Sequence, residues 1–151
     1  MKRKLLVGLH VTATGVATLV IATFFISSLL AELSGDLNGI KLVKRCILYA
    51  LPILILAMPT LAITGSKLAG NTSTKYVKRK KRRMKLVMLQ GLLLIGLAVF
   101  LYYQSHMKSI NDTFLIAQSA ELIFGLINLT LIGLNAKDGL ALSGRFDKPI
   151  D

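Results

Sequence analysis

The sequence predicts an all-α fold, a bundle of four transmembrane helices that forms one domain over residues 1–151. Hydrophobic residues make up 54% of the chain and charged residues only 17%, with a mean hydropathy of +0.64. A soluble domain carries about a quarter charged residues, so the deficit points to lipid. Four apolar runs are each long enough to cross a bilayer at about 1.5 Å per residue. Lys and Arg gather between and beside these runs, which is typical of membrane topology.

The first apolar run covers residues 5–33 and follows a short basic start, Met1 to Lys4. A secretory signal peptide opens in the same way, but its apolar core is only about 7–15 residues long and ends at a small-residue cleavage site. This run is roughly twice that length and lacks such a site. We therefore expect an uncleaved first transmembrane helix.

Three further spans follow along the chain. Residues 32–45 are predicted as a polar, glycine-containing connection, and the second span as residues 46–64. Pro52 and Pro59 lie on one face of that span and are expected to kink it, with the freed carbonyls satisfied by neighbouring helices, although a hinge or a cation site stays open. The remaining elements are a basic loop (65–85), the third span (86–103), a short turn (104–112), the fourth span (113–134) and a polar tail (135–151).

The distribution of basic residues predicts the orientation. An even number of spans places both termini and the basic loop on one side, where fifteen Lys and Arg residues lie, against four on the other side. The positive-inside rule therefore makes both termini and the loop cytoplasmic. Lys44 and Arg45 oppose this bias, and we expect their long stems to reach the outer interface.

The basic loop contains six consecutive positive charges. Such a run can also indicate a nuclear-targeting or nucleic-acid patch. Between two spans, topology and attraction to anionic lipid headgroups explain it more simply, so we predict the lipid bilayer and no nucleic acid as its partner. The residues are Lys78, Arg79, Lys80, Lys81, Arg82 and Arg83.

Glu121 is the most informative single residue. An ionised side chain at the centre of a span costs roughly 3 kcal/mol on insertion scales, which leaves the fourth helix marginal without partner helices. Gln118, Glu121, Gly125 and Asn128 follow at intervals of three and four residues, so they share one helix face. Two interpretations stay open: a protonatable site in a transport path, or a neutral carboxyl that holds the bundle together by hydrogen bonds.

The first span offers a matching polar surface with His10, Thr14 and Thr18. The first and fourth helices run in opposite directions, so depths can be counted from the cytoplasmic ends of the two predicted spans. This count places Thr18 level with Glu121, and His10 level with Asn128. We therefore predict these two pairs as contacts.

The chain offers few residues for other chemistry. A single cysteine, Cys46, excludes an internal disulfide and a cysteine-based metal cluster. The two histidines, His10 and His106, lie at opposite ends of their spans, so they cannot both ligate one haem. A haem with one histidine and another ligand, or one shared between subunits, stays open. No nucleophile has a credible base, so we predict no enzyme activity, no metal and no cofactor.

Three segments, residues 58–70, 82–85 and 128–145, resemble a group of small uncharacterised four-helix proteins of the proteobacterial inner membrane. The resemblance covers about two thirds of the chain and implies a location, but no activity. The layout is also similar to cytochrome b561-like and copper-resistance membrane proteins, from which the missing histidine pairs depart. Small multidrug-resistance transporters are four-helix proteins too, but they carry their membrane carboxylate in the first helix.

We expect a non-enzymatic accessory or assembly partner in the membrane, which forms a homo-oligomer or binds another membrane protein. The first alternative is a small oligomeric transporter or proton-coupled component that uses Glu121. A weaker alternative is an electron-transfer subunit.

Overall fold

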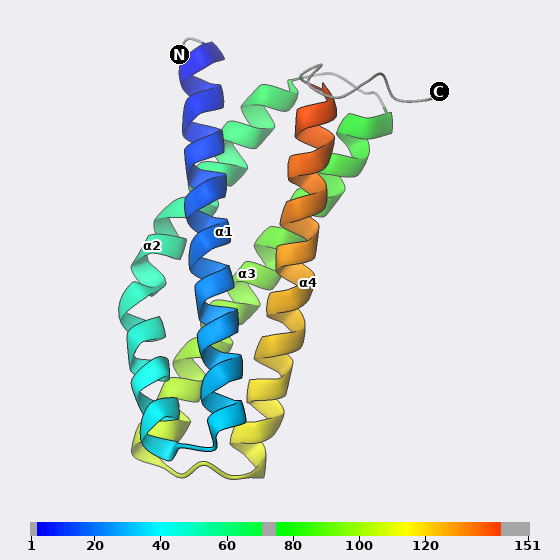
Figure 1. Cartoon of the computed structure of the whole chain (residues 1–151). Helices are drawn as coiled ribbons and strands as arrows, with labels where there is room; N and C mark the ends of the chain where they lie inside the picture. The colour runs from blue at the N-terminus through cyan, green and yellow to red at the C-terminus, as the bar shows by residue number, and fades with distance from the viewer. Residues whose placement is uncertain (1–2, 71–74, 143–151) are drawn as a thin grey trace.

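The protein folds into four long α-helices, in a computed structural model that describes residues 3–70 and 75–142. The helices are α1 (Arg3–Ser34), α2 (Leu37–Ala69), α3 (Lys75–Met107) and α4 (Asp112–Leu142) (Figure 1). Each is long and apolar enough to cross a membrane. The predicted all-α bundle of four apolar helices is confirmed, as expected of a multi-pass membrane protein.

The helices run alternately up and down (Figure 1). Neighbours in the ring α1–α2–α3–α4–α1 contact one another, so the chain forms two helical hairpins, α1–α2 and α3–α4, that pack side by side. The start of α1, the end of α2, the start of α3 and the end of α4 meet at one end, which we call the basic end. The two hairpin turns lie at the other end, which we call the turn end.

The connection predicted over residues 32–45 is much shorter in the structure. Only Gly35 and Asp36 separate α1 from α2. Gly35 has a φ of 65°, a conformation that glycine adopts without steric cost. The Asp36 carboxylate then caps α2 by accepting hydrogen bonds from the backbone N–H groups of Asn38 and Gly39, both at 3.0 Å. As a result, Lys44 lies in the second turn of a helix rather than in a polar loop.

The basic end is also more helical than predicted. α2 continues to Ala69 and α3 begins at Lys75, so the six-charge run is the first part of a helix and not a loop. α4 continues past the predicted limit of its span, residue 134, to Leu142. Charged and polar side chains end an apolar run without ending a helix, which explains both corrections. Residues 71–74 of the predicted loop and 143–151 of the predicted tail lie outside the described residues.

Burial is distributed as a bilayer requires, with apolar side chains outside and several polar ones inside. Large apolar residues such as Leu19, Leu56 and Ile116 are exposed on the outer faces. Among the described residues the interior holds three apolar clusters, one of them around Ala17 and Leu54. Buried among them are polar side chains that must satisfy one another, because lipid offers no hydrogen bonds. They are Ser28, Lys44, Thr64, Ser105, Gln118 and Asn128.

Candidate functional site

The centre of the polar interior is an ion pair between the two hairpins. The Lys44 Nζ atom on α2 lies 2.6 Å from the Glu121 Oε2 atom on α4. The Lys44 side chain is 1% exposed and the Glu121 side chain 12%. A charge-assisted hydrogen bond of this length, held away from solvent, is among the stronger polar contacts in proteins. It therefore joins the α1–α2 hairpin to the α3–α4 hairpin.

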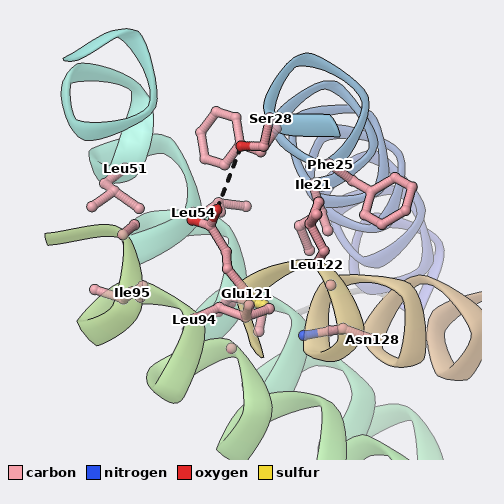
Figure 2. Close-up of a pocket in the computed structure, with 15 residues that line it drawn as sticks. Ile21, Phe25, Ser28, Leu51, Leu54, Leu94, Ile95, Glu121, Leu122 and Asn128 are labelled. Carbon is pink, nitrogen blue, oxygen red and sulfur yellow. Dashed lines mark hydrogen bonds between the residues drawn. The ribbon is translucent and has the colours of Figure 1, made fainter. Parts of the chain in front are cut away.

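Two more side chains complete the hydrogen bonding of this pair. Ser28 on α1 accepts a hydrogen bond from Lys44 Nζ at 3.0 Å and donates its hydroxyl to Glu121 Oε2 at 3.4 Å. Gln118, one turn before Glu121, donates its Nε2 to the same oxygen at 3.2 Å. A single carboxylate oxygen thus receives three donors from α1, α2 and α4. The hydrogen bond from Ser28 is visible as the dashed line in Figure 2.

Glu32 belongs to the same neighbourhood. It lies near the end of α1 and interacts electrostatically with both Lys44 and Glu121. Its Oε1 atom is buried without a hydrogen-bond partner among the described residues. The Lys44 ammonium therefore interacts with two carboxyl groups, Glu121 by direct contact and Glu32 electrostatically. We call Ser28, Glu32, Lys44, Gln118 and Glu121 the ion-pair cluster.

The ion-pair cluster lies closer to the turn end than to the middle of the bundle. Lys44 is seven residues after Leu37, the first residue of α2, and Glu121 is nine residues after Asp112, the first residue of α4. At 1.5 Å per residue both lie roughly 10–13 Å from the turn end. The four helices are 31–33 residues long, so the middle of each lies roughly 24 Å from its end.

The two pairs predicted between the first and fourth helices are wrong. Thr18 and Thr14 donate their hydroxyls to the backbone carbonyls of Thr14 and His10, one turn earlier in the same helix, both at 2.7 Å. Glu121 contacts Ser28 instead of Thr18. The depths were counted from residue 134, whereas α4 ends eight residues later at Leu142. This extension moves the level of Glu121 along α1 from Thr18 toward Ser28.

His10 and Asn128 also have partners other than those predicted. The His10 Nδ1 atom lies 2.9 Å from the Thr64 hydroxyl of α2, so it joins α1 to α2 near the basic end. The Asn128 Nδ2 atom donates to the backbone carbonyl of Val87 on α3, at a long 3.4 Å. Asn128 is 0% exposed, and its Oδ1 atom has no partner among the described residues.

A small cavity of about 50 Å³ lies between the four helices, on the side of the ion-pair cluster that faces the basic end. Its polar lining comes from Ser28, Glu121 and Asn128, and the rest is apolar, including Leu54 and Ile95. Figure 2 shows the Glu121 side chain reaching up to Ser28, with Asn128 farther along the helix that carries Glu121. A site that holds one water needs roughly 10–15 Å³ on this scale and two or more polar partners, so the cavity has room for a few waters.

The six-charge run divides between two faces of α3. Arg79 Nη2 and Arg83 Nη1 bond the two carboxylate oxygens of Asp138 on α4, at 3.1 and 2.9 Å. Lys81 Nζ donates to the backbone carbonyl of Gly70 at 3.1 Å. Lys80 lies directly over Gly139, where its Nζ occupies the space that a side chain would need. Lys78 and Arg82 are exposed.

The histidines and the acidic residues offer little for a metal. Within residues 3–70 and 75–142, no three His, Cys, Asp or Glu side chains form a group that could hold a metal ion. His106 lies near the turn end, stacked on Tyr102 with ring centroids 4.3 Å apart. His10 lies on α1 against Thr64, near the basic end.

Sequence reasoning missed Lys44, the partner of Glu121, because we assigned it to the outer interface. The sequence does contain a pattern that predicts a buried Lys44. Ile40, Lys44, Ile47 and Leu51 are spaced by four, three and four residues, so they share the helix face that is buried. A helix that starts after the capping residue Asp36 would have placed Lys44 on that face.

No protein family, curated protein or solved structure matches this chain.

Proposed function

We propose that the protein is a non-enzymatic integral membrane protein that acts as an accessory or assembly partner, either with copies of itself or with another membrane protein. The observation that carries this proposal is that the Glu121 carboxylate already has hydrogen-bond partners. Its Oε2 atom already binds Lys44, Ser28 and Gln118. A carboxyl that carries cargo must be free to exchange, whereas a carboxyl held by three donors from α1, α2 and α4 fixes the helices in place.

The outer surface of α1 offers a place for such assembly. Gly8, Thr12 and Gly15 form an exposed stripe of small residues on this helix. A side chain at Gly8 or Gly15 would meet nothing within 4 Å, whereas one at Gly91 or Gly65 would clash with Met58 or Met84 inside the bundle. Outward-facing small residues let a second transmembrane helix approach closely. This stripe therefore supports contact with another helix.

The location and orientation are part of the same proposal. The concentration of basic residues at the basic end supports a cytoplasmic position for both termini. The resemblance of residues 58–70, 82–85 and 128–145 to small proteobacterial proteins supports a bacterial inner membrane.

The test is a substitution that closes the glycine stripe without disturbing the bundle. The double variant Gly8→Leu/Gly15→Leu is compared with Gly133→Leu, which fills an equally open and exposed position on α4. Tagged protein extracted from its native membrane should bring down a stoichiometric membrane partner or a second copy, in the wild type and in the α4 variant, but not in the double variant. A monomer without partners in all three would contradict the proposal.

The second candidate is a proton-coupled component centred on Glu121. The observation that favours it is a series of buried acceptor oxygens without donors on Glu32, Gln118 and Asn128. The cavity between Glu121 and Asn128 has room for a few waters, and such waters would supply a donor to Asn128 and a path for protons toward Glu121.

Flux in liposomes separates the two candidates. A proton-coupled protein should lose its pH-driven flux in Glu121→Gln and keep it in Ser119→Ala, an exposed position two residues away. If the wild type shows no flux above empty liposomes, this candidate fails while the assembly proposal stands.

A further inference from the structure

We infer that the outer face of α3 is a binding site for an anionic phospholipid, with the headgroup on a basic stripe and an acyl chain in a hollow below it. The inference concerns a different surface from the ion-pair cluster and the glycine stripe. It does not depend on whether the protein assembles with a partner or moves protons.

The headgroup part of the site consists of Lys78, Arg82 and Lys85. These residues are spaced by four and three positions, so they share one helix face, and all three are exposed. The structure shows no hydrogen bond or ion pair for them within the described residues. The other charges of the run have contacts of their own: Arg79 and Arg83 bond Asp138, Lys81 donates to the Gly70 carbonyl in an exposed contact, and Lys80 lies over Gly139.

The same stripe continues into the apolar part of α3. Leu89, Leu92 and Gly96 follow Lys85 at intervals of four, three and four residues. Leu89 and Leu92 are 67% and 69% exposed. A shallow hollow lies here, lined by Leu89, Leu92, Leu93, Gly96 and Leu97. Gly96 lines this hollow, and a side chain added there would extend into open space, because no other atom lies within 4 Å.

The dimensions suit one lipid leaflet. Gly96 is eleven residues beyond Lys85, which is about 16 Å along a helix. Half of the hydrocarbon core of a bilayer is about 15 Å. With Lys85 at the headgroup level, the hollow therefore lies at the depth of the acyl chains in the same leaflet. The buried face of α3, with Val87, Ala98 and Leu101, points the other way into the bundle, so the stripe faces the lipid.

The occupant is an anionic phospholipid rather than a zwitterionic one. Arg82 can bond a phosphate in two places, and Lys78 and Lys85 add two point charges on the same face. A zwitterionic headgroup brings its own positive charge to this stripe and loses that attraction. A basic helix start on the outer surface of a bundle is a known kind of site for anionic headgroups.

The experiment measures phosphatidylglycerol bound to the full-length protein in phosphatidylcholine nanodiscs, by native mass spectrometry at increasing phosphatidylglycerol fractions. The test variant is Lys78→Gln/Arg82→Gln/Lys85→Gln. The matched control is Lys4→Gln/Lys67→Gln/Lys137→Gln, which removes three exposed charges from the same end on the other three helices. Each charge near an anionic headgroup changes affinity by about fivefold, so the test variant should bind phosphatidylglycerol roughly 100-fold more weakly. The control should change far less.

Three further measurements keep the inference falsifiable. The single variant Arg82→Gln should weaken binding by about fivefold, and wild-type binding should fall as salt is raised, because salt screens exposed charges. Gly96→Leu fills the hollow and should lower the amount of bound lipid, while Gly133→Leu on α4 should not. Equal losses in the two triple variants, binding insensitive to salt, or equal behaviour of the two glycine variants would overturn the site.

Discussion

The two ends of the bundle each hold an ion pair between helices, in contrasting environments. Near the turn end, Lys44 and Glu121 are 1% and 12% exposed and share their hydrogen bonds with Ser28 and Gln118. At the basic end, Asp138 is as buried as Glu121, at 13% exposed, but its partners Arg79 and Arg83 are 46% and 22% exposed. The same chemistry has different consequences in the two places, because burial and not the number of bonds decides what the loss of one partner costs.

Leaving one charge of the buried ion pair without its partner should lower the free energy of unfolding the most. Removing one member of a buried pair typically costs about 3–5 kcal/mol, because the remaining charge stays desolvated. We therefore expect Lys44→Ala and Glu121→Ala each to lower the free energy of unfolding by about that amount. Unfolding in mixed micelles as SDS is titrated measures this. A loss below about 1 kcal/mol, the range of exposed pairs, would show that the two ends do not differ.

Removing the arginine–aspartate contacts at the basic end should have a smaller effect. We expect Asp138→Asn to lower the free energy of unfolding by about 0.2–1 kcal/mol per arginine contact, since solvent screens both arginines. The same titration at low and high salt measures it, and the loss should shrink as salt is raised. A loss as large as that of Glu121→Ala would mean that the basic end is held as tightly as the ion-pair cluster.

Losing a single hydrogen bond between helices, with no opposite charge involved, should have the smallest effect on the free energy of unfolding. His10 and Thr64 join α1 to α2 through one hydrogen bond of 2.9 Å without an opposite charge. Hydrogen bonds between transmembrane helices contribute about 0.6 kcal/mol on average, so Thr64→Val should lower the free energy of unfolding by about that much. Thr60→Val, on the same helix, removes a hydroxyl that bonds only its own helix at the Leu56 carbonyl and serves as the control.

The sequence predicted the fold well and the site only in part. Length, hydropathy and charge placed four spans in the right order, because an apolar run of that length has few alternatives. The ends of the helices were misplaced where charged residues such as Lys41, Lys44 and Asp138 continue a helix beyond an apolar run. Hydropathy measures affinity for lipid and not helix propensity, so it cannot detect such extensions.

The partner of Glu121 depended on these ends. The energetic cost of a carboxylate in a span singled out Glu121 correctly as a residue that needs a neighbour. Placing Glu121 at its correct depth beside α1 requires knowing that α4 ends at Leu142. Predicting that Lys44 is buried requires knowing that α2 begins at Leu37. Both corrections bring Ser28 and Lys44 to Glu121 and leave Thr18 bonded to its own helix.

The most direct test of the buried ion pair as the contact that docks the two hairpins is a double-mutant cycle between Lys44→Met and Glu121→Leu. Each single substitution should lower the free energy of unfolding by about 3–5 kcal/mol, because each leaves one buried charge unpaired. The double variant replaces both charges with apolar side chains of similar size and should recover most of that loss. Additive losses in the double variant would contradict the ion pair as the contact that joins the hairpins.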